Sequence, residues 1–423
     1  MSVSNASPVA SSVERADDIR RRLLLYTLLI VVGANLRTVI LAVPPVLPLI
    51  RSDLGLSYTE AGILTALPTL LMGGTAWFSG LLAERIGGRA AVTVGLALLA
   101  FGAIMRAVLP DTPALFAFTI VLSLGIALAQ TSTPTLIKGW FPRQIGFASA
   151  IFTDGLIIGE TISAGLTVPL MLWLLGKDAW TLTFIFWGVL AVGILFLWLW
   201  LAPSARHTPI TGISNTTDIP VAAGALAVSG LGNNEDRRLA PTTFILPGLL
   251  LGCGSLMYFA MNTWIASYNQ AIHAPHATPP ALATLNALQL PASLGVTFFA
   301  QRLAGKRWPF VLSGAVCFIA IVGWVSAPPG LEVVWASLIG AGSAFVFALG
   351  LALPPLLATP AQVARLTGLT LTLSYTLAFV GPLVGGVLWD AFGAPSLAFL
   401  PVAAAAVALI GLSAIAPLRR ART

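Results

Sequence analysis

Charged residues are scarce in this chain. Only 9% of its 423 residues are Asp, Glu, Lys or Arg, whereas 57% are hydrophobic. A soluble protein carries about 25% charged residues, so charge this sparse cannot cover the surface of globular domains. The composition excludes a soluble enzyme, a nucleic-acid-binding protein and a disordered scaffold. Most of the chain must face lipid or other helices.

Cysteine and histidine are also few. Cys253 and Cys317 lie in apolar runs and form no CxxC pair, so the sequence indicates neither a disulfide framework nor a zinc site. His207, His273 and His276 are scattered over loops, which argues against a metal site or a catalytic triad. No phosphate-binding GxxxxGK[ST] loop is found, which argues against ATP-driven pumping. We therefore expect no cofactor.

Long apolar runs fill the rest of the chain. A membrane-spanning helix needs about 20 mostly apolar residues, and a barrel strand would need alternation over about 10 residues, which these runs lack. The twelve runs are 23–50, 58–82, 90–109, 113–137, 146–172, 180–202, 243–269, 281–303, 309–328, 331–358, 363–389 and 395–418. The sequence predicts an all-α membrane protein with twelve transmembrane helices.

The distribution of basic residues predicts the orientation. With residues 1–22 placed inside, 18 of the 22 Lys and Arg residues fall on the inner side and three on the outer side. The remaining one, Arg37, lies within the first span. Cytoplasmic loops carry such an excess of basic residues. We expect cytoplasmic tails at 1–22 and 419–423, and a location in a bacterial inner membrane.

The chain divides into two halves. Residues 203–242 are rich in Pro, Gly, Ser, Asn and charge, which predicts a cytoplasmic linker between bundles at 23–202 and 243–418. Part of the pattern repeats at an offset of 222 residues: Arg143, Gly146 and Gly159 are followed by Arg365, Gly368 and Gly381. Parallel six-helix repeats are typical of secondary transporters.

One loop motif points to a family. The segment from Gly80 through Glu84 and Arg85 to Arg89 resembles the signature of the major facilitator superfamily between helices two and three, with Glu84 where Asp is usual. The loop containing Arg302 repeats part of it. The resemblance extends over nearly the whole chain. It implies two pseudo-symmetric six-helix bundles, alternating access, and a gating role for these five residues.

The first four spans have a narrower resemblance, to the cyanate and nitroimidazole transporter branch of that superfamily. The segments that carry it are Asn35-Leu36-Arg37, Pro45-Val46-Leu47-Pro48, Leu64 to Pro68, Met105-Arg106, and Gln130 with Pro134 and Lys138. This resemblance implies a small anion or a small organic compound as substrate.

Ionisable residues inside spans are expensive, at least about 2.5–3.5 kcal/mol at the midplane. Arg37 and Glu160 each lie 14 residues into spans that run outward, so their depths match and we expect them to pair. Asp154 lies about 9 Å nearer the cytoplasm, about 120° around the helix from Glu160. The pair could simply hold the bundle together, or Arg37 could exchange Glu160 for an anionic substrate. Glu160 and Asp154 are candidate proton-coupling residues, with a structural hydrogen bond as the alternative for Asp154.

Polar and aromatic residues at similar depth complete the candidate substrate site. Besides Arg37, the set consists of Gln130, Tyr258, Asn262, Trp264 and Tyr375. Such groups suit a small planar anion or a heteroaromatic ligand, although polar side chains also join helices to one another. Arg106, near an outer helix end, is expected to reach the membrane interface.

The sequence therefore predicts a secondary active transporter that moves a small anionic solute, such as cyanate, by alternating access, with proton symport as one mode of coupling. The alternative is an exporter of nitroimidazole-like or other toxic organic compounds. An intramembrane enzyme would need a nucleophile–base pair or metal cluster at one depth, and the sequence offers neither. We expect a monomer whose partners are a small molecule and the lipid bilayer, without nucleic acid.

Overall fold

The computed structural model describes residues 8–175, 180–203, 241–303, 305–326, 330–357 and 360–415, and in these ranges the regular structure is entirely helical. The elements of the first half are α1 (Pro8–Leu41), α2 (Val43–Leu54), α3 (Tyr58–Ile86), α4 (Gly88–Val108), α5 (Thr112–Trp140), α6 (Ile145–Leu175) and α7 (Trp180–Leu201). Those of the second half are α8 (Pro241–Ala271), η2 (Pro275–Ala277), α9 (Thr278–Ala287), α10 (Gln289–Leu303), α11 (Trp308–Ser326), α12 (Glu332–Leu351), α13 (Leu353–Leu357), α14 (Pro360–Phe392), η3 (Pro395–Phe399) and α15 (Leu400–Ile415). Most of the predicted linker, 204–240, and the predicted C-terminal tail lie outside the described residues.

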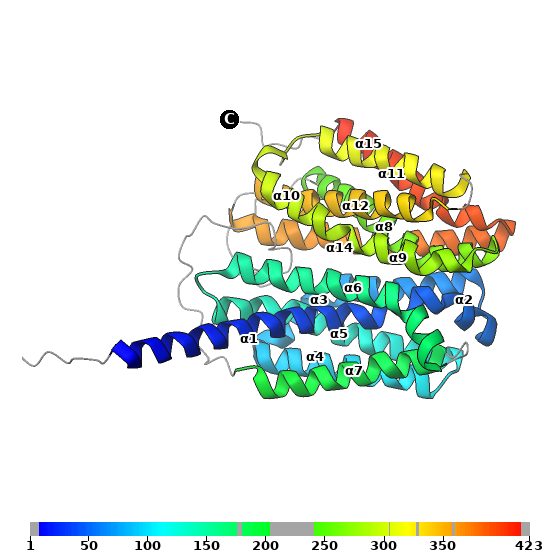
Figure 1. The fold of residues 1–423 in the computed structure, drawn as a ribbon. Coiled ribbons are helices and arrows are strands. Elements are labelled where there is room, and N and C mark those ends of the chain that lie inside the picture. The colour runs from blue at the N-terminus through cyan, green and yellow to red at the C-terminus, as the bar shows by residue number, and fades with distance from the viewer. Residues whose placement is uncertain are drawn as a thin grey trace, which may run out of the picture.

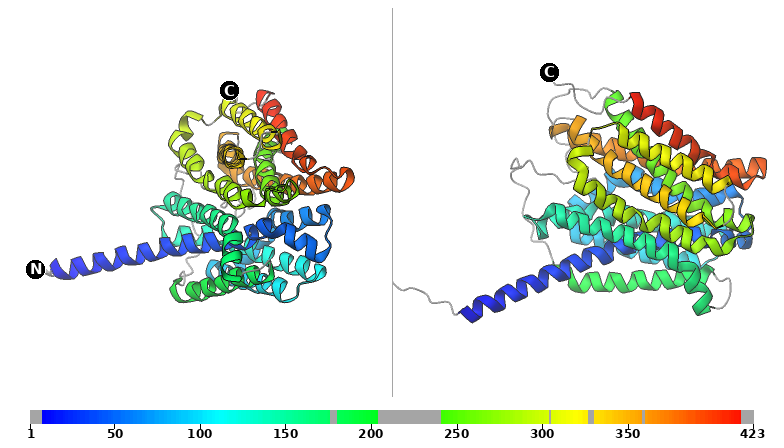
Figure 2. Two further views of the ribbon diagram at one scale, coloured as in Figure 1. Left: turned by 45° about the vertical axis from the view of Figure 1, so that its right-hand side comes forward. Right: turned by 45° about the horizontal axis from the view of Figure 1, so that its top comes forward.

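The helices form two groups that lie side by side. Helices α1–α7 make one group and α8–α15 the other, with their axes running in broadly the same direction (Figure 1). A turned view keeps the two groups apart (Figure 2, left). The groups meet where α3 packs along α14, α6 along α9, and α2 against α8. This all-helical, two-group architecture agrees with the predicted fold class.

Several predicted spans are broken helices. Ten helices of the described part are long and apolar enough to cross a membrane, and α3, which is bent, makes an eleventh. The predicted span 281–303 is divided at Leu288 into α9 and α10, and each piece is too short to cross alone. The all-helical membrane fold agrees with the prediction, while the described part of the chain contains ten or eleven candidate spans in place of the predicted twelve.

The first span is also divided, and proline explains the break. Helix α1 begins at Pro8, within the predicted N-terminal tail, and ends at Leu41; α2 starts at Val43 with Pro44 and Pro45 in its first turn. Proline has no N–H and clashes with the preceding turn, which interrupts the regular helix at Ala42, although Ile19–Leu54 as a whole is long and apolar enough to form one span. The bend lies only a few residues beyond Arg37.

Helices α1 and α6 approach very closely through small residues. A Cβ built on Gly159 would lie 2.1 Å from the Ala34 carbonyl oxygen, and one on Gly155 would lie 2.6 Å from the Ile30 oxygen. Glycine permits this approach because it has no side chain. The contact fixes the relative height of Arg37, on α1, and Glu160, which follows Gly159 on α6.

The two halves are joined most firmly at the far end of the bundle, which we define as the end where α2 finishes and α3 begins. One core cluster there includes Val46, Leu47 and Ile50 of α2 together with Met257 and Met261 of α8. A second cluster is confined to the first half, apart from the packing of Tyr375 against it. Hydrophobic packing thus closes the far end across the two halves.

Candidate functional site

A buried ion pair occupies the middle of the bundle. Arg37 Nε lies 3.3 Å from Glu160 Oε1, and the two side chains are only 8% and 7% exposed. This is the pair that the matched depths predicted. The distance is longer than the 2.7–2.9 Å typical of charge-assisted hydrogen bonds, and Nε makes no hydrogen bond of good geometry.

The rest of the guanidinium group is weakly bound. Its Nη1 atom donates to the thioether sulfur of Met72 at 3.8 Å, and sulfur is a weak acceptor. Tyr375 of α14 also lies beside Arg37, and its hydroxyl group interacts with the guanidinium through a side-chain hydrogen bond. Arginine carries five N–H donors, so Arg37 retains donor capacity that this environment does not use fully.

Glu160 is held mainly by the second half of the chain. Its Oε2 atom lies 2.8 Å from the hydroxyl oxygen of Tyr258 on α8 and accepts from Nε2 of Gln289, the first residue of α10, at 3.2 Å. The carboxyl group therefore bridges the two halves, with Arg37 on one side and two polar groups on the other.

A chain of amides extends from Tyr258. The tyrosine hydroxyl lies 2.5 Å from Asn286 Oδ1, and Asn286 Nδ2 donates to Asn262 Oδ1 at 3.0 Å and to the Leu282 carbonyl at 2.8 Å. Asn262 Nδ2 in turn donates to the backbone carbonyl of Tyr258 at 3.1 Å. All three side chains are buried, so the orientation of each amide is fixed by its partners.

The structure brings some predicted site residues together and separates others. Arg37, Glu160, Tyr258, Asn262 and Tyr375 share this centre. Trp264 instead packs against Tyr58 and Trp389 in the far-end closure, with ring centroids 6.2 and 5.7 Å away. We therefore leave Trp264 out of the proposed binding set.

Gln130 and Asp154 have no recorded interaction with the Arg37–Glu160 pair among the described residues. The buried Oε1 atom of Gln130 has no hydrogen-bond partner. Asp154 is partly buried and lies six residues nearer the N-terminal end of α6, less than two helical turns from Glu160. Their binding and coupling roles stay predictions.

The predicted gating residues lie at the near end of the bundle, which is the end opposite the far end. Gly80 is partly buried, Glu84 and Arg85 are exposed, and Arg89 donates to the Leu199 carbonyl at 3.2 Å. The side chain of Arg302 lies outside the described residues. No described contact assigns a gating role to these residues, which also stays a prediction.

Sequence reasoning missed three members of the centre: Met72, Asn286 and Gln289. Asn286 and Gln289 flank the break between α9 and α10, and both are polar residues within an apolar run. That signal was present in the sequence. Met72 offered none, because methionine is an ordinary core residue.

Arg106 differs from its expectation. It is 1% exposed and does not reach an interface. Its Nη2 atom donates to the Val39 carbonyl at 2.7 Å, and its guanidinium carbon lies 4.0 Å above the Phe184 ring. The prediction of interfacial anchoring is wrong, because Arg106 binds the last turn of α1 beside the proline break.

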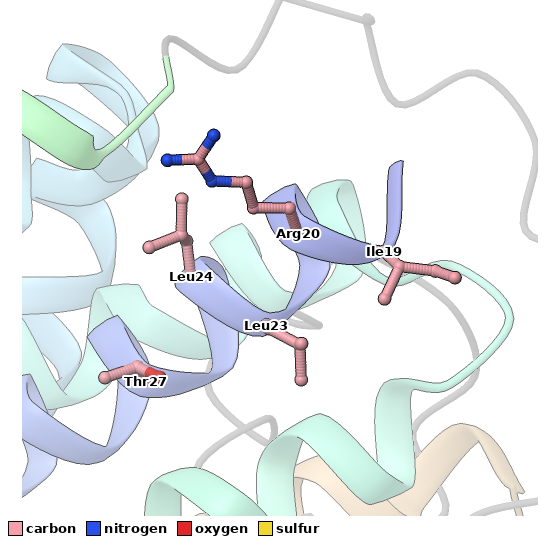
Figure 3. A pocket seen from close by; sticks show the side chains of 5 residues that line it. All are labelled: Ile19, Arg20, Leu23, Leu24 and Thr27. Carbon is pink, nitrogen blue, oxygen red and sulfur yellow. The ribbon is translucent and has the colours of Figure 1, made fainter. Parts of the chain in front are cut away.

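A hollow in the surface lies elsewhere. It runs along the N-terminal part of α1 and is lined by Ile19, Arg20, Leu23, Leu24 and Thr27 (Figure 3). All five residues are exposed, and the hollow contains none of the residues of the Arg37 centre. We assign it no part in the candidate site.

Comparisons with known proteins agree with this architecture. The sequence model described as Major Facilitator Superfamily matches residues 23–337. The cyanate transport protein CynX of Escherichia coli K12 is 27% identical over 85% of this chain and 88% of its own length. The 2-nitroimidazole transporter of the same strain is 27% identical over 93% and 96% of the two chains. An uncharacterized transporter of Bacillus subtilis, YycB, is 28% identical over 86% of each chain.

Solved structures show the same fold at lower sequence identity. A bacterial homolog of the human lysosomal transporter Spinster superposes with a TM-score of 0.70 at 14% identity, over 95% of this chain and 99% of its own. A mutant of the nucleoside transporter NupG gives 0.68 at 14% identity, over 92% and 99%. The family match, the two helical groups and the relatives lead to one conclusion: the chain belongs to the major facilitator superfamily and is an integral membrane transporter of small solutes, not an enzyme.

Proposed function

We propose that this transporter moves a small anion across a bacterial inner membrane and that the side chain of Arg37 binds the anion. Both termini would lie in the cytoplasm. The observation that carries the proposal is the state of the Arg37 guanidinium. It is buried, its contact with Glu160 is long, and a terminal nitrogen faces a thioether. An anion at this point would gain charge-assisted hydrogen bonds in a low-dielectric site.

Glu160 would act as the counter-ion that the anion replaces. A carboxylate that leaves Arg37 still has Tyr258 and Gln289 as partners in the second half. Substrate binding would therefore change how strongly the two halves are joined at the midplane. This exchange supports alternating access, and it gives Glu160 a position from which a proton can be coupled to transport. We propose that the protein works as a monomer.

A second candidate function rests on the relatives. The 2-nitroimidazole transporter matches nearly the full chain, and Tyr258 and Tyr375 could stack on a planar ring. A neutral heteroaromatic ligand would not need the charge of Arg37. The two functions therefore differ in their dependence on this one side chain.

The test is a thermal-shift screen of purified wild type, Arg37→Gln and Arg37→Lys with cyanate, nitrite, formate and 2-nitroimidazole. A ligand at 100 times its Kd adds about 2.7 kcal/mol of apparent stability. We expect an anion to stabilise wild type, to have no effect on Arg37→Gln, and to act weakly on Arg37→Lys, because lysine cannot form the planar two-pronged contact.

The exposed Arg143→Gln provides a control with the same change in net charge. If Arg37→Gln binds the anion as well as this control does, Arg37 is structural and the proposed function is wrong. Binding of 2-nitroimidazole alone, independent of Arg37, would favour the second candidate.

A further inference from the structure

The hydrogen bonds around Tyr258 require one more proton than the ionised site contains. Tyr258 Oη lies 2.8 Å from Glu160 Oε2 and 2.5 Å from Asn286 Oδ1, both within hydrogen-bond distance. The hydroxyl group supplies only one hydrogen. With Glu160 ionised, one of these two contacts would be between atoms that can only accept.

The amide of Asn286 cannot resolve the conflict by turning over. Its Nδ2 atom already has two acceptors, Asn262 Oδ1 and the Leu282 carbonyl. Asn262 is fixed as well, because its own Nδ2 donates to the Tyr258 carbonyl. If the oxygen and nitrogen of Asn286 were exchanged, its NH2 group would face the Tyr258 hydroxyl. Its oxygen would then face two other acceptors, Asn262 Oδ1 and the Leu282 carbonyl oxygen, with no hydrogen between them. The acceptor that faces Tyr258 must therefore be Oδ1.

A protonated Glu160 satisfies every contact. Its Oε2–H donates to Tyr258 Oη, and the Tyr258 hydroxyl donates to Asn286 Oδ1. Gln289 can still donate to Oε2 at 3.2 Å. A neutral carboxyl group also accounts for the long 3.3 Å approach of Arg37 Nε to Oε1, because a carboxylate would form a shorter contact.

The charged groups around Glu160 determine how many anions the site can bind for each proton. Among the described residues near Glu160, α1 contributes Arg37 and α8 contributes Tyr258, while α9 and α10 contribute the amides of Asn286 and Gln289. Asp154 lies six residues away on α6 itself, about 120° around the helix from Glu160. Helix α9 contains no charged residue, and neither does α8. With Glu160 protonated, the centre carries one uncompensated positive charge, on Arg37.

We propose that Glu160 and Tyr258 together hold the coupling proton, and that the site transports one monovalent anion with one proton, without net movement of charge. This deepens the proposed function and rests on it. The ligand-free site takes up the proton before the anion: it is neutral with Glu160 ionised, and it carries one positive charge with Glu160 protonated, the form that the contacts of Tyr258 require. One bound monovalent anion then makes the loaded site neutral again. A divalent anion would leave a net negative charge in the membrane interior, which is unfavourable. Tyr258 is a positioning residue: its hydroxyl oxygen accepts the hydrogen bond of the Glu160 O–H group, and its own O–H donates to Asn286 Oδ1.

The first test needs no ligand. Infrared spectroscopy of the purified, ligand-free protein between pH 5 and 8 should detect the carbonyl band of a protonated carboxyl group, and Glu160→Gln should remove it. In Tyr258→Phe the band should persist but move to higher frequency, because the carboxyl O–H loses its acceptor. Tyr268→Phe is the matched control: Tyr268 lies on the same helix, is buried, and packs in an aromatic cluster with Phe399. It should leave the band unchanged.

The second test measures coupling in proteoliposomes with radiolabelled cyanate. Uptake into wild-type vesicles should follow an imposed pH gradient and be insensitive to an imposed membrane potential, and Glu160→Gln should lose the response to pH. The absence of a carboxyl band in the wild type, or the same band shift in Tyr268→Phe as in Tyr258→Phe, would overturn the inference. Uptake that responds to voltage would overturn the one-to-one stoichiometry. Anion binding that is independent of Arg37 would overturn the proposed function while leaving the infrared result intact.

Discussion

The arginines of the first half illustrate how environment decides the role of one residue type. Arg37 faces a carboxyl group, a thioether and a tyrosine, so its donors are only partly used. Arg106 is buried more completely, but its guanidinium is matched to a carbonyl oxygen and an aromatic face. Arg51 stacks on Tyr58, with its guanidinium carbon 4.0 Å from the ring centroid. Among the arginine side chains of the first half that the structure describes, only Arg37 combines burial with unused donor capacity and a neighbouring acid.

At this scale we predict that Arg106→Lys is not conservative. The ammonium group is more strongly hydrated than a guanidinium and cannot stack on Phe184. The substitution should lower the free energy of unfolding by about 1–2 kcal/mol, measured as a lower midpoint of thermal unfolding in detergent. Arg143→Lys, on an exposed loop, should leave the midpoint unchanged. Equal midpoints for the two variants would mean that Arg106 contributes no such contact.

Among the helices, the α1–α6 contact has the most direct effect on the site. Its glycines bring two backbones so close that the charged side chains beyond them are forced to the same height. Beyond the break at Pro44 and Pro45, α2 packs against α8 of the second half. The close contact of α1 with α6 and the break after α1, and not the charges themselves, therefore determine which groups lie next to Arg37.

We predict opposite effects for one added methyl group at two helical glycines. Gly159→Ala would place a Cβ against the Ala34 carbonyl oxygen, whereas a Cβ on Gly193 meets nothing within 4 Å. Gly159→Ala should destabilise the protein by about 1–3 kcal/mol and weaken anion binding by separating Arg37 from Glu160. Gly193→Ala should be neutral or stabilise by up to about 1 kcal/mol, since alanine favours helix. Thermal unfolding and the anion thermal shift measure both effects, and unchanged anion binding in Gly159→Ala would contradict the proposed coupling.

At the scale of the whole molecule, a small polar latch joins the halves at the far end. Asp390, near the end of α14, accepts from the backbone N–H of Tyr58 at 2.9 Å and from the N–H and hydroxyl of Thr59 at 2.7 and 2.6 Å. These donors lie at the N-terminus of α3, where a negative charge is favoured. Tyr58 also stacks on Trp389, with centroids 3.9 Å apart. The latch stabilises the conformation in which the far end is closed.

We predict that Asp390→Asn shifts the population towards a conformation open at the far end. An amide offers one acceptor oxygen in place of two and carries no charge, so at least one contact to Tyr58 or Thr59 is lost. Spin labels at Pro110→Cys and His276→Cys, on exposed loops of the two halves, should report a larger fraction of long distances.

Asp53→Asn is the matched control for this variant. Asp53 accepts from Trp180 Nε1 at 2.9 Å within the first half, so this substitution should leave the distance distribution unchanged. An identical shift in both variants would show that the latch has no specific role.

The class of molecule and the central ion pair could be predicted from the amino-acid pattern alone. Charge scarcity and apolar runs require a membrane protein, because the surface of a soluble domain could not be covered. The matched depths of Arg37 and Glu160 follow from helical rise alone, and the structure contains the pair. These features depend on composition and on the position of each residue along its own helix, so they can be predicted from the sequence.

Which side chains from distant helices contact one another could not be predicted from the sequence and becomes visible in the folded chain. Trp264 and Tyr258 are six residues apart on α8, yet one lies in the far-end closure and the other contacts Glu160. Asn286 and Gln289 reach the centre because α9 and α10 break at Leu288 and pack across from α6. Arg106 is buried by α1 and α7, which no pattern on its own helix records. Contacts between helices depend on rotation, bending and the exact approach of backbones, and these are settled by packing of the whole chain.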